Sequence, residues 1–169
     1  MWDHNISLLA VQETKLYPND MPTDLFKSTY FKLGTTSGTR GHLWVVHPHW
    51  KNNVRLWPDL GANDPNILWV QVKCDHTEWL AASVYLPNPT TPNDVKETKT
   101  TISQLIVDVE SLPSTTPIII MGDMNADPFT NKGSNVTQFR RLTNHPRRAS
   151  NPQTLAEQLN TRRKCHPPR

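Results

Sequence analysis

The chain has 169 residues, 36% of them hydrophobic and 20% charged, which suits one domain with a hydrophobic core. Fifteen prolines against six glycines favour strands joined by turns over a helical bundle. No apolar run approaches the ~20 residues of a membrane-spanning helix, and the first residues lack the basic and apolar segments of a signal peptide. We therefore expect an intracellular, non-secreted protein with no membrane partner.

The net charge of +3 is distributed unevenly along the chain. Residues 140–169 carry seven arginines and one lysine against one glutamate, a net charge of +7, whereas residues 1–139 have a net charge of −4. We therefore divide the chain into a domain over residues 1–139 and a basic, poorly patterned tail over residues 140–169. Such a tail could bind the phosphate backbone of a nucleic acid, or it could be a solvated segment without a partner.

The first strand patterns are short. Residues 6–11 form a nearly continuous apolar run, typical of a strand buried on both faces, and polar residues 12–15 follow it directly. Residues 43–46 and 54–57 predict two further strands, each closed by a proline within two residues. The early part of the chain is therefore predicted to be rich in β structure.

The strongest local β signal comes next. Residues 66–74 and 79–85 are rich in β-branched and aromatic residues and are separated by four polar residues, which predicts an antiparallel hairpin. In the first run Gln71 and Lys73 fall on the same face as Ile67 and Trp69, so we expect that face to be only partly covered.

A helix and a last strand follow the hairpin. Thr91, Pro92 and Asp94 form a helix-start signal, with a capping threonine, proline at the first helical position and an acid three residues after the cap. Apolar residues then recur at helical spacing until Pro113, and residues 118–121 form another run typical of a buried strand. This order of elements predicts an α+β fold in which a sheet packs on a helix.

Two of the apolar runs end in carboxylates, the first at Glu13 and the last at Asp123 and Asp127. Layered α/β enzymes place their sites at such strand ends. If the chain is extended there, Asp123 and Asn125 point to one face, and Gly122 leaves room for a ligand. Carboxylate and amide oxygens suit Mg²⁺, but the same residues are common in solvated turns, so the spacing leaves both interpretations open.

Three motifs, in this order, resemble successive motifs of the endonuclease/exonuclease/phosphatase family. They are LLAVQETKL at residues 8–16, ASVYLPNP at residues 82–89 and IIIMGDMNADP at residues 118–128. The resemblance is closest to apurinic-type DNA endonucleases and to the endonuclease domains of non-LTR retrotransposons. It implies a DNase I-like, four-layered α/β sandwich, with two packed sheets, helices outside and the site at one mouth, here in partial form.

The resemblance also implies roles for individual residues. Glu13 matches the principal Mg²⁺ ligand, with Mn²⁺ as an alternative ion, and Tyr85 matches the tyrosine whose phenol contacts the scissile phosphate. Asp123 is similar to the residue that orients or deprotonates the attacking water, and Asn125 to the amide that hydrogen-bonds the phosphate or that water. The implied reaction is metal-assisted hydrolysis of a phosphodiester, with DNA as the expected substrate.

Two further residues of these motifs are expected to have supporting roles. Asn88 is expected to be a turn residue beside the site, and Asp127 to be structural. Four histidines are expected in loops or at strand edges, and not as metal ligands: His42, His47, His49 and His76.

Other parts of the family pattern have no counterpart in this sequence. The family has an earlier strand with an asparagine beside the metal, and later strands with an aspartate and a Ser-Asp-His motif. His145 and His166 lie in proline contexts without a preceding apolar strand, and neither replaces the missing histidine. We therefore expect a copy truncated at both ends, of retroelement origin, with weak or no activity.

Two other functions stay open from the sequence. The first is a catalytically dead fragment that binds nucleic acid through its basic tail. The second is a family member that acts on a small phosphoester or a phospholipid headgroup.

Overall fold

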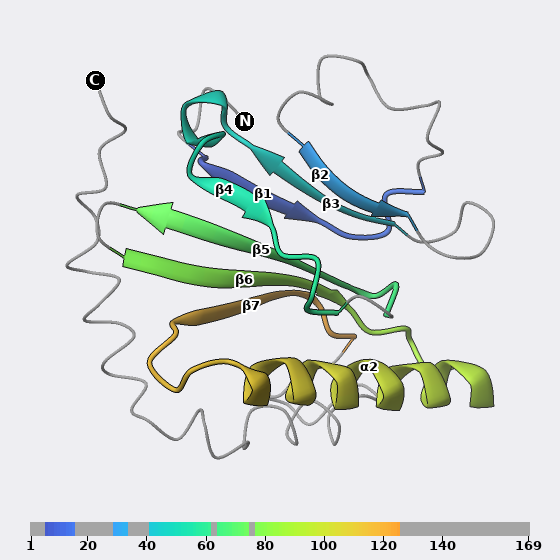
Figure 1. The fold of residues 1–169 in the computed structure, drawn as a ribbon. Helices are drawn as coiled ribbons and strands as arrows, with labels where there is room; N and C mark the ends of the chain where they lie inside the picture. The colour runs from blue at the N-terminus through green and yellow to red at the C-terminus, as the bar shows by residue number, and fades with distance from the viewer. Residues whose placement is uncertain (1–5, 16–28, 34–40, 62–63, 75–76, 126–169) are drawn as a thin grey trace.

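The computed structural model describes residues 6–15, 29–33, 41–61, 64–74 and 77–125. In this part of the chain, strands form two sheets, and a long helix packs on the second sheet (Figure 1). Sheet A has three strands in the order β1-β3-β2, and both pairs are antiparallel. Its strands are β1 (Leu8–Val11), β2 (Thr29–Leu33) and β3 (Gly41–Val46).

Sheet B has four strands in the order β4-β5-β6-β7. The first two pairs are antiparallel, and β6 and β7 are parallel because helix α2 crosses between them. The elements are β4 (Val54–Leu56), β5 (Ile67–Cys74), β6 (Thr77–Tyr85), α2 (Pro92–Ser111) and β7 (Ile118–Asp123), and a short 3₁₀ helix, η3 (Pro48–Trp50), precedes β4.

The predicted hairpin is confirmed as β5 and β6. Their pairing runs from Ile67 opposite Val84 to Cys74 opposite Thr77, so only residues 75 and 76 join the two strands. The predicted four-residue link is therefore wrong by two residues, because Thr77 and Glu78 continue the ladder although both are polar and exposed.

Helix α2 begins where its capping residues predict. The Thr91 hydroxyl accepts a hydrogen bond from the Asp94 N–H at 3.2 Å, and the Asp94 carboxylate accepts one from the Thr91 N–H at 2.9 Å. This capping box satisfies two of the N–H groups that a helix start leaves without partners. The predicted apolar stripe is confirmed, because Ile102, Leu105 and Val109 are buried.

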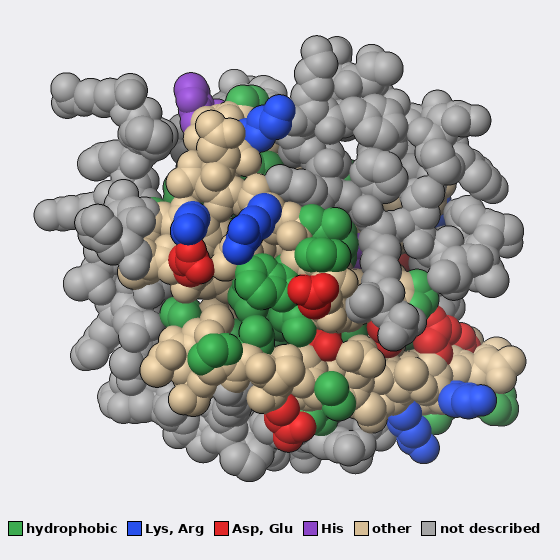
Figure 2. All heavy atoms as spheres, viewed as in Figure 1, with side chains coloured by type: hydrophobic (Ala, Val, Ile, Leu, Met, Phe, Trp, Pro, Cys, Tyr) green, Lys and Arg blue, Asp and Glu red, His purple; other side chains and the backbone are tan. Residues whose placement is uncertain are grey.

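Two hydrophobic cores separate the structure into layers. The core between the sheets contains Trp44, Val46, Val54, Leu68, Val70, Val72 and Ala81. The core between sheet B and α2 contains Leu60, Ile67, Trp69, Leu80, Ala82, Val84, Leu86, Ile102, Leu105, Val109 and Leu112. Figure 2 shows hydrophobic side chains gathered between α2 and the strands above it.

A buried tryptophan indole contributes a hydrogen bond between each pair of layers. The Trp44 indole N–H of β3 donates to the Leu68 carbonyl of β5 at 3.0 Å and joins the sheets. The Trp69 indole N–H of β5 donates to the Asp108 carboxylate of α2 at 2.8 Å, and the Gln104 amide donates to the other oxygen of that carboxylate. A buried carboxylate without such donors would be costly, so Asp108 fixes the position of α2 on the sheet.

Sheet A, sheet B and α2 confirm the predicted α+β sandwich of packed sheets with a helix outside. Within the described residues these are three of the four expected layers. No helix in this part of the chain is long and apolar enough to cross a membrane.

The burial predicted for two strands is wrong. Residues 8–11 and 118–121 were expected to be buried on both faces, but β1 is half-buried, with Leu9 38% exposed, and residues 118–121 of β7 are half-buried throughout. Each of these strands has a described neighbour on one edge only. Strand β2 was not predicted, because the run of residues 29–33 is short and no proline or glycine directly precedes it to mark where a strand begins.

Gly122 has a different role from the predicted one. Its φ is +149°, and an added Cβ would lie 1.8 Å from the Val84 carbonyl oxygen of β6. The space beside Gly122 is therefore filled by the neighbouring strand and does not admit a ligand. Gly122 is needed because β6 and β7 approach closely just before Asp123.

We predict that Gly122→Ala destabilises the fold by about 2–5 kcal/mol, since the added methyl overlaps backbone and favours a different φ. Urea unfolding followed by circular dichroism measures this change. Val107→Ala, on the exposed face of α2, is the control and should change stability little. Equal stability of the Gly122→Ala protein and the parent protein would contradict the close approach of the strands.

Candidate active site

The ends of three strands lie on the same side of the sandwich. Strands β1, β6 and β7 run in one direction and end at the right in Figure 1. Tyr85 is the last residue of β6 and pairs with Asp123, the last residue of β7. Because paired residues of parallel strands share a face, Asp123 and Tyr85 both lie on the face of sheet B that is directed toward sheet A. Glu13 follows the end of β1.

Two hydrogen bonds attach the end of β1 beside these strands. The Gln12 side-chain amide donates to the Ser83 hydroxyl of β6 at 2.8 Å, and Ser83 lies two residues before Tyr85 on the same face. The Thr14 N–H donates to the Gly41 carbonyl at the start of β3, at 3.2 Å. Glu13 is therefore held between two anchored residues, and Cα atoms of β1 and β7 approach within 8 Å. The structure thus brings the predicted residues Glu13, Tyr85 and Asp123 to one end of the sheets.

The backbone is strained at this end. Among the described residues, the non-glycine positions with positive φ are Glu13 at +50°, Lys15 at +50° and Asn125 at +45°. Such a conformation costs a non-glycine residue about 1–3 kcal/mol and persists only where the surroundings hold it. All three positions lie at the ends of β1 and β7, which is typical of a functional site.

Asn125 has a structural contact that the sequence did not indicate. Its side-chain amide donates to the Leu86 carbonyl at 2.7 Å, and its own N–H donates to the Asp123 carboxylate at 2.9 Å. The Leu86 N–H in turn donates to the Asp123 carbonyl at 2.9 Å. Asn125 is not extended, so the predicted alignment of its side chain with that of Asp123 is wrong; a tight turn after β7 replaces it.

The exposure of the candidate side chains limits what each can do. Glu13 and Asp123 are exposed, so both carboxylates can reach a ligand in solvent. One Asp123 oxygen accepts from the Asn125 N–H, and no described residue is bonded to the other oxygen. Tyr85 is 6% exposed and is therefore largely closed to solvent. The arrangement offers two carboxylates along a solvent-accessible edge, with the buried Tyr85 paired beside Asp123.

These donors fit a loosely held magnesium ion better than an ion enclosed by protein. No three His, Cys, Asp or Glu side chains among the described residues are grouped closely enough to hold a metal ion. Mg²⁺ is commonly bound by one or two carboxylates together with water and substrate phosphates. Glu13 and Asp123 are the carboxylates available for that arrangement.

Two polar residues near the site were missed by sequence reasoning. His42, expected in a loop or at a strand edge, is 1% exposed within β3, so that expectation is wrong. Its Nδ1 lies 3.2 Å from the Ser83 hydroxyl, which also accepts from Gln12. The available signal was a serine inside the apolar run of residues 80–86 and a histidine directly before the apolar run of residues 43–46, because a buried polar residue needs a partner.

The other predicted residues lie around or outside this arrangement. Asn88 is exposed in the turn after β6, where its carbonyl accepts from the Thr90 N–H at 2.8 Å, in agreement with its predicted turn role. His47 and His49 lie in or beside η3, at the opposite end of β3, with their rings stacked 5.0 Å apart. Four predicted positions lie outside the described residues: His76, Asp127, His145 and His166. The basic tail also lies outside them.

A hollow of about 460 Å³ lies at the opposite end of sheet B, between β6 and the segment that follows α2. Its walls include Trp57, Leu80 and Leu112, and its polar edge includes Gln71 and Glu78.

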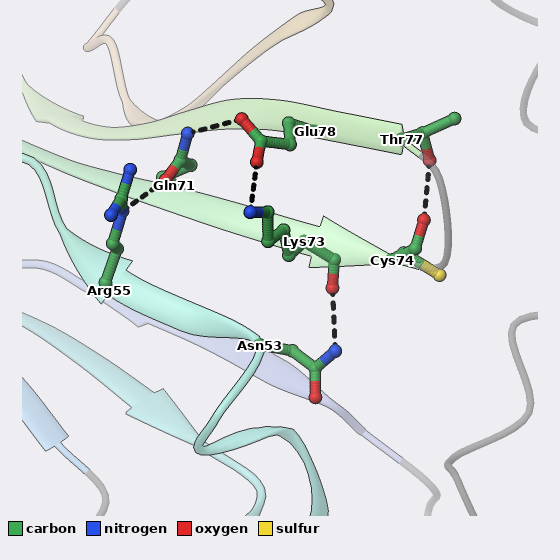
Figure 3. Close-up of polar contacts among 7 residues, drawn as sticks. All are labelled: Asn53, Arg55, Gln71, Lys73, Cys74, Thr77 and Glu78. Carbon is green, nitrogen blue, oxygen red and sulfur yellow. Dashed lines mark hydrogen bonds and ion pairs between the residues drawn. The ribbon is translucent and has the colours of Figure 1, made fainter.

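The polar groups at that edge are already paired with one another (Figure 3). The Arg55 side chain donates to Oε1 of Gln71, the Gln71 side-chain amide donates to Glu78 at 2.9 Å, and Glu78 forms an ion pair with Lys73 at 2.6 Å. A binding pocket needs polar groups directed at its ligand. This hollow therefore resembles a catalytic site less than the strand ends do.

Comparison with solved structures identifies the fold as the DNase I-like sandwich. The 3′ phosphatase NExo from Neisseria, bound to a product DNA hairpin, is 17% identical with a TM-score of 0.57, over 83% of this chain and 61% of that one. The endonuclease domain of TRAS1, a telomere-specific non-LTR retrotransposon, is 16% identical with a TM-score of 0.58, over 84% of this chain and 59% of that one. An AP endonuclease from Archaeoglobus fulgidus is 13% identical with a TM-score of 0.57, over 83% of this chain and 61% of that one.

The sequence profile of the Endonuclease/Exonuclease/phosphatase family matches residues 3–168. The chain belongs to this family, as its three motifs predict. No curated protein sequence matches it. The chain spans about three fifths of the length of the solved structures named above, namely 61%, 59% and 61%.

Proposed function

We propose that the chain is a metal-dependent phosphodiester hydrolase that acts on nucleic acid, with DNA as the preferred substrate, and that it derives from a retroelement endonuclease. The observation that carries the proposal is the convergence of Glu13, Tyr85 and Asp123 at the ends of three strands. Membership of the family and the DNA-bound state of NExo support it. The likeness to the TRAS1 endonuclease domain supports the retroelement origin.

Each residue would have a distinct task in this reaction. Glu13 would hold Mg²⁺ or Mn²⁺, which neutralises charge on the phosphate when bound. Asp123 would orient a water molecule with the carboxylate oxygen that no described residue contacts. The water oxygen would form a bond to phosphorus, and the water proton would pass to Asp123. The bond from phosphorus to the leaving oxygen would break, and that oxygen would take a proton from solvent. The Tyr85 hydroxyl would donate to a non-bridging phosphate oxygen.

Asn125 would act on this water through Asp123. Its side-chain amide is bonded to the Leu86 carbonyl, and its N–H holds one oxygen of the Asp123 carboxylate. The other Asp123 oxygen is then directed by a turn that β6 and β7 fix together. A positioned base of this kind typically contributes 10²–10⁴-fold to rate.

We propose that the 169-residue chain by itself turns over slowly. Groups that surround one phosphate act as a unit, and loss of one preorganised donor costs roughly 10²–10³-fold in rate. The described residues supply two carboxylates and one phenol for this unit, and no group of three His, Cys, Asp or Glu side chains that could hold a metal ion is found among them. Binding of the metal and of the phosphate would both be loose.

The metal assignment predicts that Glu13→Gln weakens Mn²⁺ binding by more than about tenfold, because the substitution removes the charge and keeps the shape. Titration followed by electron paramagnetic resonance of free Mn²⁺ measures the affinity. Glu110→Gln, in the last turn of α2, is the control and should bind as the parent protein does. Unchanged binding after Glu13→Gln would exclude Glu13 as the ligand.

The experiment that tests the function is nicking of supercoiled plasmid in Mg²⁺ or Mn²⁺. We expect slow nicking that chelation abolishes and that Asp123→Asn lowers by about 10²-fold or more, because the base is lost. Nicking that Asp123→Asn leaves unchanged would reject the assignment of Asp123. Rapid nicking that Asp123→Asn abolishes would reject the proposed low activity.

A second candidate function is binding of nucleic acid without catalysis, through residues 140–169. Its support is the net charge of +7 on this segment, against −4 on residues 1–139, which we propose as the separate folded domain. A positively charged segment binds DNA mainly by releasing counterions from the phosphates. Hydrolysis of a small phosphoester or a phospholipid headgroup remains a further alternative for the same strand-end site.

Binding through this segment predicts a steep loss of DNA affinity with salt, with a logarithmic slope of about −0.9 for each phosphate contacted. Replacement of Arg147, Arg148, Arg162 and Arg163 by glutamine should lower the affinity and reduce the slope. Fluorescence anisotropy with a labelled duplex at several salt concentrations measures both quantities. Affinity that does not change with salt would contradict an electrostatic tail.

A further inference from the structure

A buried chain of hydrogen bonds connects the two sheets directly beneath the candidate site. The Gln12 amide donates to the Ser83 hydroxyl at 2.8 Å, and that hydroxyl lies 3.2 Å from Nδ1 of His42. His42 is 1% exposed and Ser83 is fully buried, while Gln12 is half-buried at the end of β1. The three residues come from the end of β1, the start of β3 and the last third of β6.

The Ser83 hydroxyl can serve both contacts at once. Its oxygen accepts the Gln12 proton and keeps a second lone pair and its own proton for Nδ1 of His42. One buried hydroxyl of β6 thus joins the end of β1 and the start of β3, which stiffens the contact between the sheets.

We propose that Gln12, Ser83 and His42 are positioning residues that hold Glu13 in its left-handed backbone conformation and thereby direct its carboxylate. The inference rests on the proposed function, because it assigns a task to Glu13. Its independent support is the φ of +50° at Glu13, between the Gln12 side-chain bond to Ser83 and the Thr14 backbone bond to Gly41. A strained residue between two anchors keeps its conformation only while both anchors hold.

The chain of bonds also couples Glu13 to the other candidate residues. Ser83 lies two residues before Tyr85 on the same face of β6, opposite Met121 of β7. Gln12 therefore fixes the end of β1 to the strand whose own end carries Tyr85 and pairs with Asp123. Residues that orient a metal ligand without touching the metal typically change metal affinity by 10–100-fold when replaced.

The Gln12–Ser83–His42 bonds could serve only to pack one sheet on the other, without any effect on Glu13. A second buried hydrogen bond between the same sheets provides a control for this explanation. The Trp44 indole N–H donates to the Leu68 carbonyl between the same two sheets, and Trp44 is fully buried. Trp44 pairs with Ala10 of β1, but its indole N–H bonds the Leu68 carbonyl and neither Gln12 nor Ser83. Trp44→Phe therefore removes one buried bond between the sheets and leaves the anchors of Glu13 in place.

The test measures Mn²⁺ affinity and amide exchange in the full chain for Ser83→Ala, Gln12→Met and His42→Asn. Ser83→Ala and Gln12→Met should each weaken Mn²⁺ binding about tenfold or more. Both should also make the Thr14 amide proton exchange faster than any loss of global stability explains. His42→Asn should keep near-parent affinity, because the asparagine side-chain amide can pair with the Ser83 hydroxyl in place of Nδ1. Trp44→Phe should lower stability without either effect.

Parent-like Mn²⁺ affinity and Thr14 exchange in folded Ser83→Ala or Gln12→Met protein would overturn the proposal. Equal weakening of Mn²⁺ binding by Trp44→Phe would do the same, because it would reduce the effect to sheet packing. If Ser83→Ala does not fold, Gln12→Met decides, since Gln12 is only half-buried. Failure of the proposed function gives a different result: Glu13→Gln leaves Mn²⁺ binding unchanged while Thr14 exchange still responds to Gln12→Met.

Discussion

The parallel pairing of β6 with β7 determines where two of the candidate catalytic side chains, Tyr85 and Asp123, lie. Its register places Tyr85 beside Asp123, and the Leu86 N–H continues the ladder to the Asp123 carbonyl one step further. The strands can approach this closely only because Gly122 has no side chain to meet the Val84 carbonyl. A one-residue shift of β7 would turn the Asp123 carboxylate toward α2, so the site exists only in this register.

The features that the sequence predicts well are those that depend on neighbours in the chain. The cap of α2 needs only Thr91 and Asp94, three residues apart, and the hairpin of β5 and β6 needs only alternation on each side of a short turn. The sequence also predicts that one face of β5 is only partly covered. The structure confirms this, since Lys73 is exposed on that face while Trp69 is buried in the core between sheet B and α2.

The features that the sequence does not predict depend on contacts between distant segments. Gln12 and Ser83 are 71 positions apart, and nothing near either residue indicates the other. The burial of His42 follows from the packing of one sheet on the other. The left-handed backbone of Asn125 follows from its bond to the Leu86 carbonyl, 39 positions away. The local pattern therefore located the strand ends, but not the bonds that arrange the side chains there.

The contact between Trp69 and Asp108 gives the molecule an internal optical reporter. The Trp69 indole is 1% exposed, and its N–H is bonded to a carboxylate that α2 alone provides. Undocking of α2 would move that negative charge away from the ring and admit water to it, which shifts the ring's fluorescence emission. Since α2 connects β6 to β7, the contribution of Trp69 to the emission of the six tryptophans would report whether the strand pair that carries Tyr85 and Asp123 is assembled.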